Sequence, residues 1–356
     1  MIDFLIIGGG IAGVSAAASL SALGSVTVLE SEDALGYHAS GRSAALFEEN
    51  YGAPSTVMLN TASREFHENA GVLSPRGIML IGTPDKAAQF EADRLMLKLD
   101  PLTLAEAQEM IPILDGQVID RAAYHDDAKD IDTDKLLQSF VRTARANGGQ
   151  IVTKSAVTRI TRDAHGWAVQ TAAETYVAKV IVNAAGAWVD QIATMAGIAP
   201  LGFTPLRRSM GRIAAPGGHD VSAWPMLFGP GEDWYAKPDA GALIVSPAEE
   251  DATTPHDAFA DDMTLAEGFA RYQEHVTEEV TRPLSSWAGL RTFAADRTLV
   301  LGPDKNDVHF IWCAGQGGYG MQSAPGASQL LADIMGGRPS NIPADTIAAL
   351  SPARFA

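Results

Sequence analysis

The sequence predicts a mixed α/β fold in which one layer is built around a parallel sheet and the other layer is α+β. Three stretches share the order apolar strand, small-residue turn and helix, and they lie at residues 4–23, 180–197 and 310–335. Between the last two, residues 200–255 alternate short strand patterns with proline and glycine turns. The repeated order is typical of a helix-covered parallel sheet, and the segments between its parts are assigned to the second layer.

Length and charge limit the kind of protein this is. A chain of 356 residues with 46% hydrophobic content is long enough for roughly two domains and a large core. The 43 acidic against 26 basic residues give a net charge of −17, which disfavours nucleic acid or an anionic membrane surface as a partner.

Cysteine content and apolar runs indicate the compartment. Cys313 is the single cysteine, so the chain forms no internal disulfide and no cysteine-based metal cluster, and we expect no metal site. No run approaches 18 apolar residues, and the first strand begins too close to Met1 for a secretion signal. We therefore expect a cytoplasmic protein without a transmembrane segment.

The first thirty residues carry the most specific motif, in the order strand, glycine turn, helix and strand. Gly8, Gly10 and Gly13 fit the pattern Gly-x-Gly-x-x-Gly, in which the first allows the turn and the second lets backbone approach a pyrophosphate. The third lets the helix pack on the strand. The second strand ends at Glu30, where a carboxylate is placed to accept ribose hydroxyls. Because strand, helix and acid agree, the motif predicts dinucleotide binding rather than a plain βαβ turn.

Residues 31–43 follow as a polar loop punctuated by glycine. Arg42 lies within Gly41-Arg42-Ser43, which is either a surface turn or a segment whose N–H groups and guanidinium lie near cofactor phosphates. The residues by themselves leave both interpretations open.

The remaining elements follow from caps, breakers and periodicity. Helices are predicted at 85–99, at 104–111 with the capping box Thr103–Glu106, at 135–146 capped by Asp132 or Thr133, and at 264–275 capped by Thr264–Glu267. Strands are predicted at 150–153, 156–161, 167–171, 175–178, 180–183 and 310–314.

The last strand–turn–helix unit decides between two cofactors. The glycine-rich loop 315–320 stands between the strand 310–314 and a helix at 323–335. A simple nucleotide fold does not need this second glycine loop, whereas a cofactor held at both its pyrophosphate and its ring system does. The sequence therefore favours FAD over NAD, and an NAD dehydrogenase stays as the weaker alternative.

Nine ordered motifs extend this interpretation over nearly the whole chain: residues 8–13 (GGGIAG), 36–45 (GYHASGRSAA), 130–134 (DIDTD), 182–188 (VNAAGAW), 207–209 (RRS), 224–227 (WPML), 235–241 (YAKPDAG), 287–291 (WAGLR) and 316–320 (QGGYG). In these motifs the chain resembles the D-amino acid oxidase-like flavoprotein superfamily, and within it most closely the D-amino acid dehydrogenases of the D-arginine dehydrogenase type.

The resemblance implies a Rossmann-like FAD-binding domain (1–75, 136–205 and 286–356) and a discontinuous substrate-binding domain (76–135 and 206–285), as in D-amino acid oxidase and glycine oxidase. It implies noncovalent FAD, with Cys313 a buried small hydrophobe. The implied cofactor residues are Gly8, Gly10, Ile11, Ala12, Gly13, Glu30, Ser31, His38, Ser40, Gly41, Arg42, Ser43, Ala44, Ala45, Val157, Ala185, Gly186, Trp188, Arg291, Gly315, Gly317, Gly318, Tyr319, Gly320, Met321 and Gln322.

For the substrate, the resemblance carries over Arg291 as the carboxylate clamp, with Arg208 nearby, Tyr51 and Tyr235 as hydroxyl partners, and Gly318 beside the flavin. An arginine fork binds a carboxylate through two charge-assisted hydrogen bonds. No histidine or acid lies in a motif that demands a general base, so positioning is the main requirement for catalysis.

The chain departs from arginine-preferring relatives in the side-chain pocket. Ile78 stands about where those relatives carry an acid for the guanidinium, and Leu46 stands where they carry a histidine. Glu48 either replaces the missing acid from another wall or belongs to a solvated acidic pair with Glu49. We therefore expect neutral or apolar side chains to be preferred.

The resemblance implies oxidative deamination of a free amino acid, of D configuration. A hydride passes from Cα to the flavin N5, and the resulting imine hydrolyses to a 2-oxo acid and ammonia. Two alternatives remain: a secondary-amine oxidase or dehydrogenase acting on a glycine, sarcosine or proline type of substrate, and a flavin-binding subunit without turnover. The sequence does not specify whether oxygen, a quinone or another carrier accepts the electrons.

Overall fold

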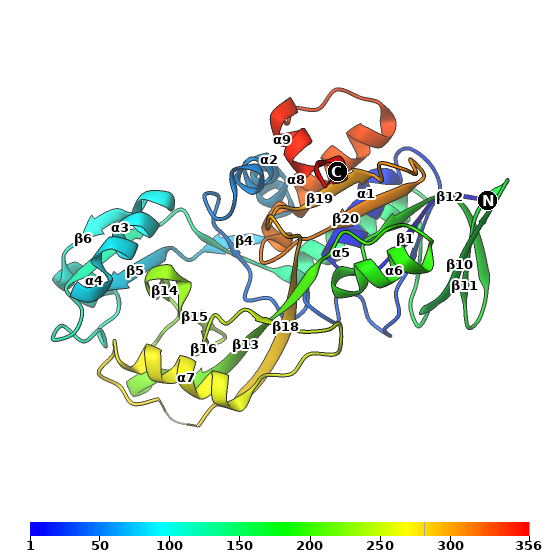
Figure 1. Ribbon diagram of the computed structural model, residues 1–356. Coiled ribbons are helices and arrows are strands. Elements are labelled where there is room, and N and C mark those ends of the chain that lie inside the picture. The colour runs from blue at the N-terminus through cyan, green and yellow to red at the C-terminus, as the bar shows by residue number, and fades with distance from the viewer. Residues whose placement is uncertain (281, 356) are drawn as a thin grey trace.

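The computed structural model describes residues 1–280 and 282–355. The molecule is elongated and has two main sheets (Figure 1). One sheet lies at the right of Figure 1 with both chain termini, and the other lies at the left with α3, α4 and α7. This arrangement agrees with the predicted mixed α/β fold.

The first sheet holds the nucleotide motif. Its strands follow the order β10-β11-β12-β1-β2-β9, and β12 also pairs with β20, which pairs with β19. The pairs of β1 with β2 and β12, of β2 with β9 and of β12 with β20 are parallel. The strands are β1 (Ile2–Ile7), β2 (Val26–Leu29), β9 (Gln150–Val152), β10 (Val157–Asp163), β11 (Gly166–Thr171), β12 (Thr175–Asn183), β19 (Val300–Pro303) and β20 (Phe310–Ala314).

Helices cover this sheet because its central strands are apolar on both faces. In β1, Phe4 and Ile6 pack into one hydrophobic cluster while Leu5 and Ile7 pack into another. Such two-sided burial is typical of parallel strands. The helices of this region are α1 (Ile11–Leu20), α2 (Pro54–Ala70), α5 (Thr133–Ala146), α6 (Val189–Met195), α8 (Gly320–Gly336) and α9 (Ala344–Leu350).

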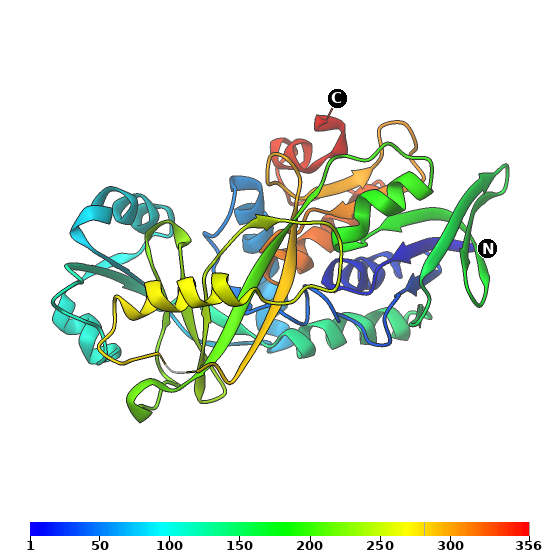
Figure 2. The same ribbon diagram turned by 60° about the horizontal axis from the view of Figure 1, so that its bottom comes forward.

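The second sheet is mostly antiparallel and follows the order β17-β13-β16-β15-β14-β5-β7-β6, with β18 pairing β13. Figure 2 shows α7 lying across its front. The elements are β5 (Ile78–Gly82), α3 (Ala87–Met96), β6 (Asp100–Leu102), α4 (Leu104–Met110), β7 (Arg121–His125), β13 (Thr204–Ala214), β14 (Met226–Phe228), β15 (Tyr235–Asp239), β16 (Ala242–Ser246), β17 (Asp251–Ala252), α7 (Asp262–Gln273) and β18 (Ser285–Phe293).

The long pair β13 and β18 brings the two regions together. It pairs nine residues in register, from Thr204 with Phe293 to Arg212 with Ser285, and so places Arg208 opposite Gly289. A small third sheet consists of β3 (Leu46–Phe47), β8 (Lys129–Ile131) and β4 (Leu73–Pro75), and Figure 1 shows β4 between the main sheets. The division of the chain into two domains by residue number stays a prediction.

Several predicted elements are confirmed, and some boundaries differ. The capping box at Thr103 and Glu106 is present, and Asp132 rather than Thr133 caps α5. The strands predicted at 175–178 and 180–183 form one strand, β12. The cap of α7 is Asp261, whose carboxylate reaches the N–H of Thr264, so the predicted cap at Thr264 is wrong.

The helix α2 was not predicted. Its buried face carries Thr56, Asn60, Ser63 and His67, each fully buried, where a helix of this length ordinarily shows apolar residues. The hydrophobic periodicity that identifies a helix is therefore missing from this segment.

Within the residues that the structure describes, no helix is both long enough and apolar enough to cross a membrane.

Candidate active site

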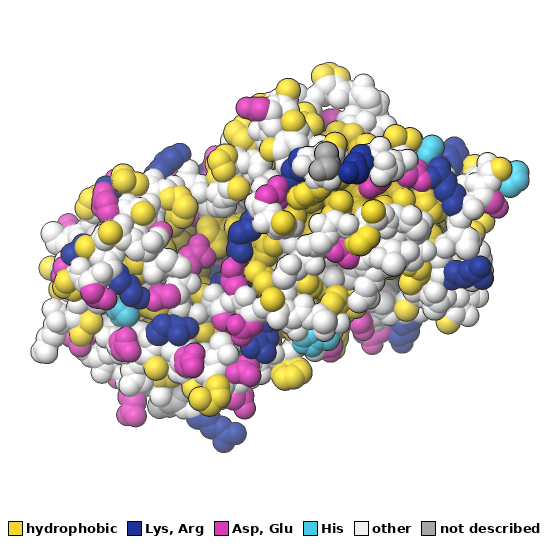
Figure 3. All heavy atoms as spheres, in the orientation of Figure 1, with side chains coloured by type: hydrophobic (Ala, Val, Ile, Leu, Met, Phe, Trp, Pro, Cys, Tyr) yellow, Lys and Arg dark blue, Asp and Glu magenta, His cyan; other side chains and the backbone are white. Residues whose placement is uncertain are grey.

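Two adjoining cavities lie along the edge where the parallel strands of the first sheet end. We call them the outer cavity, which borders Glu30, Val157 and Trp188, and the inner cavity, which borders Arg291 and Tyr235. Both cavities share the lining around Ser40, Gly186 and Gly289, so they adjoin, and we call the pair the channel. Ligands of open α/β sheets bind at this edge. The face drawn in Figure 3 is hollowed between the two regions, with acidic and basic side chains around the hollow.

Backbone packing requires glycine at two positions of the first turn. Gly8 has φ +112°, and a Cβ on it would lie 2.4 Å from the carbonyl oxygen of Ala184. A Cβ on Gly13 would lie 1.8 Å from the carbonyl oxygen of Gly8. Gly10 differs, because its Cβ would approach only the Ser40 hydroxyl, at 3.2 Å. Gly8 and Gly13 therefore allow the strand–helix packing, and Gly10 leaves its backbone accessible from the cavity.

The N-terminus of α1 opens onto the inner cavity. Gly10, Ile11 and Ala12 line the cavity, and no acidic side chain lies in the first turn of the helix. The Ser40 hydroxyl accepts a hydrogen bond from the N–H of Ile11 at 2.9 Å. Free first-turn N–H groups and the helix dipole make such an end suitable for an anion.

Glu30 lies at the outer cavity and is buried. Its carboxylate accepts from the N–H of Gly9 at 2.6 Å, from the N–H of Glu32 at 2.9 Å and from the Ser31 hydroxyl at 3.0 Å. An ionised carboxylate has about four acceptor positions, so it keeps room for a further hydroxyl donor.

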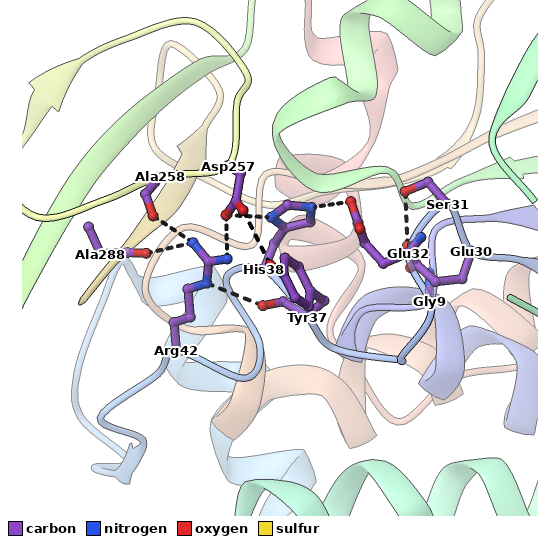
Figure 4. Close-up of polar contacts among 10 residues, drawn as sticks. All are labelled: Gly9, Glu30, Ser31, Glu32, Tyr37, His38, Arg42, Asp257, Ala258 and Ala288. Atoms are coloured by element: carbon purple, nitrogen blue, oxygen red, sulfur yellow. Dashed lines mark hydrogen bonds and ion pairs between the residues drawn. The ribbon is translucent and has the colours of Figure 1, made fainter. Parts of the chain in front are cut away.

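Arg42 lies beside both cavities, yet its guanidinium is bonded to protein groups (Figure 4). It donates to the carbonyl oxygens of Tyr37 at 3.2 Å, Ala258 at 2.8 Å and Ala288 at 3.0 Å, and to the carboxylate of Asp257. Four of its five N–H donors are thus engaged within the chain. The structure therefore gives Arg42 contacts that the interpretation as a phosphate ligand did not include.

His38 also belongs to this network. Its Nε2 lies 3.0 Å from the Glu32 carboxylate, and its ring packs against Trp188 with 4.7 Å between ring centroids. Figure 4 shows His38 between Glu32 and Asp257.

Neighbouring side chains require glycine at two positions of the second glycine loop. A Cβ on Gly317, which has φ +51°, would lie 2.3 Å from the Phe293 ring. A Cβ on Gly318 would lie 1.8 Å from Nη2 of Arg291. The absence of a side chain at Gly318 thus makes room for the arginine. The helix α8 begins at Gly320 with no acidic residue in its first turn, and that turn borders the inner cavity.

Arg291 donates hydrogen bonds to two residues, Tyr51 and Glu250. Its Nη2 donates to the Tyr51 hydroxyl at 3.3 Å, and that hydroxyl donates to the Glu232 carboxylate at 2.8 Å. Its Nη1 donates to Glu250 at 3.3 Å. Burial, with the charge of Glu232 adding to it, raises the pKa of Tyr51 above its usual value, so the hydroxyl stays protonated.

Arg208 is the second buried guanidinium of the inner cavity. Its Nη2 lies 3.5 Å from the same Glu250 oxygen that Arg291 contacts. Burial, and then the neighbouring charge of Arg291, lower the pKa of Arg208 below its usual value. The two positive groups are thus held close together, with Glu250 as a shared counter-ion.

The far wall of the inner cavity is apolar, and Leu46, Ile78, Leu97, Met226 and Phe228 line it. Glu48 stands beside these residues but is buried, at 4% exposed.

The carboxylate of Glu48 has partners within the protein. One oxygen accepts from the N–H and the side-chain amide of Asn50, at 3.0 and 3.1 Å, and the other lies 2.9 Å from Nε2 of His125. Glu49 pairs with Arg64 instead. The interpretation of Glu48 and Glu49 as one solvated acidic pair is therefore wrong. Burial opposes the charged form of His125, but its pairing with the Glu48 carboxylate raises its pKa overall.

The structure brings the predicted residues together. All eight predicted substrate residues line the inner cavity, and all predicted cofactor residues except Gly13, Gly41 and Tyr319 line one cavity or the other. Those three lie behind the lining: Gly13 packs on Gly8, Gly41 donates its N–H to Gly36, and Tyr319 packs against Tyr51. Cys313 is buried as expected, and burial raises its pKa to about 12.

Sequence reasoning missed Glu232 and Glu250. Glu232 has φ +54° and ends the turn Pro230–Glu232, while Glu250 precedes β17. The Pro-Gly dipeptide signalled the turn. No local pattern indicated that Glu250 would pair with Arg291 or that Glu232 would bond the Tyr51 hydroxyl beside it.

The residues fit FAD. Along the channel lie a helix end suited to an anion, a buried acid and a second glycine loop, which are the parts that a dinucleotide with a ring system requires. Among the described residues, the buried Thr292 Oγ1 and Gln316 Oε1 border the inner cavity without a hydrogen-bond partner in the protein. Such atoms suit a polar ligand.

Comparisons with known proteins agree with this geometry. The chain is 24% identical to FAD-dependent oxidoreductase domain-containing protein 1 of Bos taurus, over 94% of this chain and 81% of that protein. Its fold is similar to L-proline dehydrogenase from P. horikoshii, with TM-score 0.85 and 20% identity over 99% and 97% of the two chains. It is also similar to glycine oxidase from Geobacillus kaustophilus, with TM-score 0.80 and 21% identity over 99% and 98%.

The family model for FAD dependent oxidoreductases, DAO, matches residues 3–334. This match covers nearly all of the chain, from the first strand to the helix α8. The chain therefore belongs to the DAO family of FAD-dependent oxidoreductases.

Proposed function

We propose that the chain oxidises the carbon–nitrogen bond of a free amino acid with a neutral or apolar side chain, and that this occurs in the inner cavity. The observation that carries the proposal is the position of the Arg291 guanidinium, which lies against Gly318 of the second glycine loop and beside the Tyr51 hydroxyl. A carboxylate bound there would hold its Cα next to the loop that borders the flavin ring.

FAD would lie along both cavities. Its pyrophosphate would bind at the N-terminus of α1, Glu30 would accept from the adenosine ribose, and the ring would border residues 315–318. When bound, FAD supplies the oxidant that accepts two electrons from the substrate. The α8 N-terminus would favour the negative charge that builds on the reduced ring.

The protein would bind and orient the substrate. Arg291 and Arg208 would take the carboxylate, each charge-assisted hydrogen bond contributing about 1.5–3 kcal/mol. Tyr51 and Tyr235 would add hydroxyl contacts, since both line the inner cavity. The product imine would hydrolyse to a 2-oxo acid and ammonia.

The far wall supports the preference for neutral side chains. Ile78 and its apolar neighbours offer no counter-charge, and both oxygens of Glu48 already have partners in the protein. Transfer of a guanidinium to such a wall without a partner is unfavourable. D configuration, and the likeness to the D-arginine dehydrogenase type, rest on the sequence motifs.

A second candidate is oxidation of a secondary amine of the proline or glycine type. The fold likeness to L-proline dehydrogenase, at TM-score 0.85, favours it about as much as the motifs favour the first candidate. Both candidates use the same carboxylate clamp, so the residues around Arg291 do not separate them.

The test is anaerobic mixing of the holoenzyme with single compounds while flavin absorbance is recorded. The panel contains D-Leu, D-Met, D-Phe, their L forms, D-Arg, glycine, sarcosine and L-proline. Reduction by the neutral D-amino acids supports the first candidate, and faster reduction by L-proline, sarcosine or glycine supports the second. A flavin that stays oxidised with every compound would contradict both, and faster reduction by D-Arg would contradict the neutral pocket. Readmitting air then separates an oxidase from a dehydrogenase that uses another carrier.

A further inference from the structure

A segment of the second sheet region lies over the outer cavity. Residues 253–261 connect β17 to α7, and their His256 and Ala258 line that cavity although they precede a helix of the other region. Ala258 is buried and packs with Ala187, Ala288 and Leu290. Phe259, the next residue, is 72% exposed. The segment therefore has an inner side on the cavity and an outer side in solvent, and we call it the strap.

Arg42 fastens the strap to the loop of residues 36–43 and to β18 (Figure 4). Its guanidinium bonds the strap at Asp257 and at the carbonyl oxygen of Ala258, and bonds β18 at the carbonyl oxygen of Ala288. The backbone of Arg42 adds another contact, because its carbonyl oxygen accepts from the indole N–H of Trp287 at 3.1 Å.

Asp257 is held from one side by the loop of residues 36–43. It pairs with Arg42, accepts from the Tyr37 hydroxyl at 3.3 Å and lies 3.9 Å from Nδ1 of His38. The hydrogen bond from Arg42 lowers the pKa of Asp257, so the carboxylate is charged. Asp257 itself does not line either cavity.

We infer that the strap closes over the adenosine half of FAD, and that Arg42 and Asp257 slow FAD release by fastening the strap rather than through a bond from Arg42 to the FAD phosphates. The inference rests on the placement of FAD proposed above. Release through the outer cavity requires the strap to lift, and lifting breaks the contacts of Arg42 with Asp257 and Ala258.

The competing explanation is that Arg42 binds the FAD phosphates directly. The two explanations predict opposite signs for Asp257→Asn. If the charge of Arg42 acted on the phosphates, removing the nearby negative charge would strengthen FAD binding. If the strap holds the cofactor, the same substitution weakens the fastening and speeds release.

The experiment measures FAD release from the holoenzyme by flavin fluorescence after dilution, in Asp257→Asn, Arg42→Gln and the double variant. Asp251→Asn is the matched control, because Asp251 lies just before the strap, pairs with Arg207 at 2.7 Å and has a side chain 57% exposed against 59% for Asp257. We expect release about 3- to 10-fold faster in D257N and R42Q, the size of one weak ion pair with its hydrogen bonds. The double variant should be no faster than the faster single variant, since both break one fastening.

Release at or below the wild-type rate in D257N would overturn the inference, and so would equal acceleration in D251N. If R42Q does not fold, D257N decides the question alone. The measurement uses no substrate, so it stands even if no amino acid reduces the flavin. Glu30→Ala tests the placement separately: unchanged FAD affinity in that variant would show that FAD does not lie in the outer cavity.

Discussion

The two glycine turns of the channel look alike in the sequence but differ in what makes glycine necessary. At Gly8 and Gly13 a Cβ would meet backbone carbonyls of the turn itself and of the adjacent strand end. At Gly317 and Gly318 it would meet the side chains of Phe293 and Arg291, which come from β18 of the other sheet. The first turn is thus a self-contained feature of the nucleotide fold, whereas the second connects the proposed cofactor site to the proposed substrate site.

The largest expected effect tests the first turn. Gly13→Ala forces a Cβ against the Gly8 carbonyl, and backbone cannot move aside as a flexible side chain can. We expect a loss of about 3 kcal/mol or more of unfolding free energy, together with loss of FAD. Gly10→Ala should keep the fold, because its Cβ meets a single hydroxyl. It should lose only the cofactor. Thermal unfolding and flavin content measure both variants, and a stable, yellow G13A protein would contradict the comparison.

The next effect tests the second turn. Arg291→Met removes the proposed clamp and should lower kcat/KM for a carboxylate substrate by roughly 100-fold, which is about 3 kcal/mol, while the FAD spectrum stays intact. Gly318→Ala should show the same pattern more weakly, since it only displaces the end of the arginine side chain. Unchanged steady-state kinetics in R291M would refute the clamp, and loss of FAD in either variant would show that the second turn is no different from the first.

A smaller effect concerns the hydroxyl between Arg291 and Glu232. Tyr51→Phe removes one hydrogen bond from the arginine and one to the acid, and we expect KM to rise about 5-fold, for roughly 1 kcal/mol. Tyr319→Phe is the control, because Tyr319 packs against Tyr51 without lining the cavity. Equal KM values in the two variants would mean that Tyr51 acts only by packing.

The smallest effect is on stability and depends on pH. Since the folded-state pKa of His125 is raised, its pairing with Glu48 stabilises the protein fully below the unfolded pKa of about 6.5 and is lost as pH rises through the folded pKa. His125→Gln should therefore cost about 1 kcal/mol at pH 6 and less at pH 9. Urea unfolding at the two pH values measures this difference, and a larger cost at pH 9 would contradict the pairing.

Local chemistry explains which parts were predictable. The turn 8–13 and the capping box at Thr103 depend on residues a few positions apart, so their patterns are visible in the sequence. The helix α2 was not visible, because its buried face is polar. There Asn60 donates to the carbonyl oxygens of Glu49 and Tyr51, and His67 meets the carbonyl oxygen of Gln322. These partners are known only once the chain has folded.

The same limit applies within the site. Arg42 was predicted from the sequence motifs to lie at the cofactor, but its partners on the strap and on β18 lie 215 or more positions away. Glu232 accepts a hydrogen bond from the Tyr51 hydroxyl, and Glu250 accepts one from Arg291. Neither acid lies in a local pattern that points to the arginine.

By itself, the sequence determined the strand–glycine–helix turn and predicted a dinucleotide there, because the constraint on that turn comes from neighbouring backbone. Through its second glycine loop and ordered motifs, the sequence also pointed to FAD. Only the tertiary structure decided that Glu48 pairs with His125, that Gly318 makes room for Arg291, and that Arg42 bonds the strap. The physical reason is that these contacts join side chains from different sheets, and their energies depend on distance and burial, which residue order does not record.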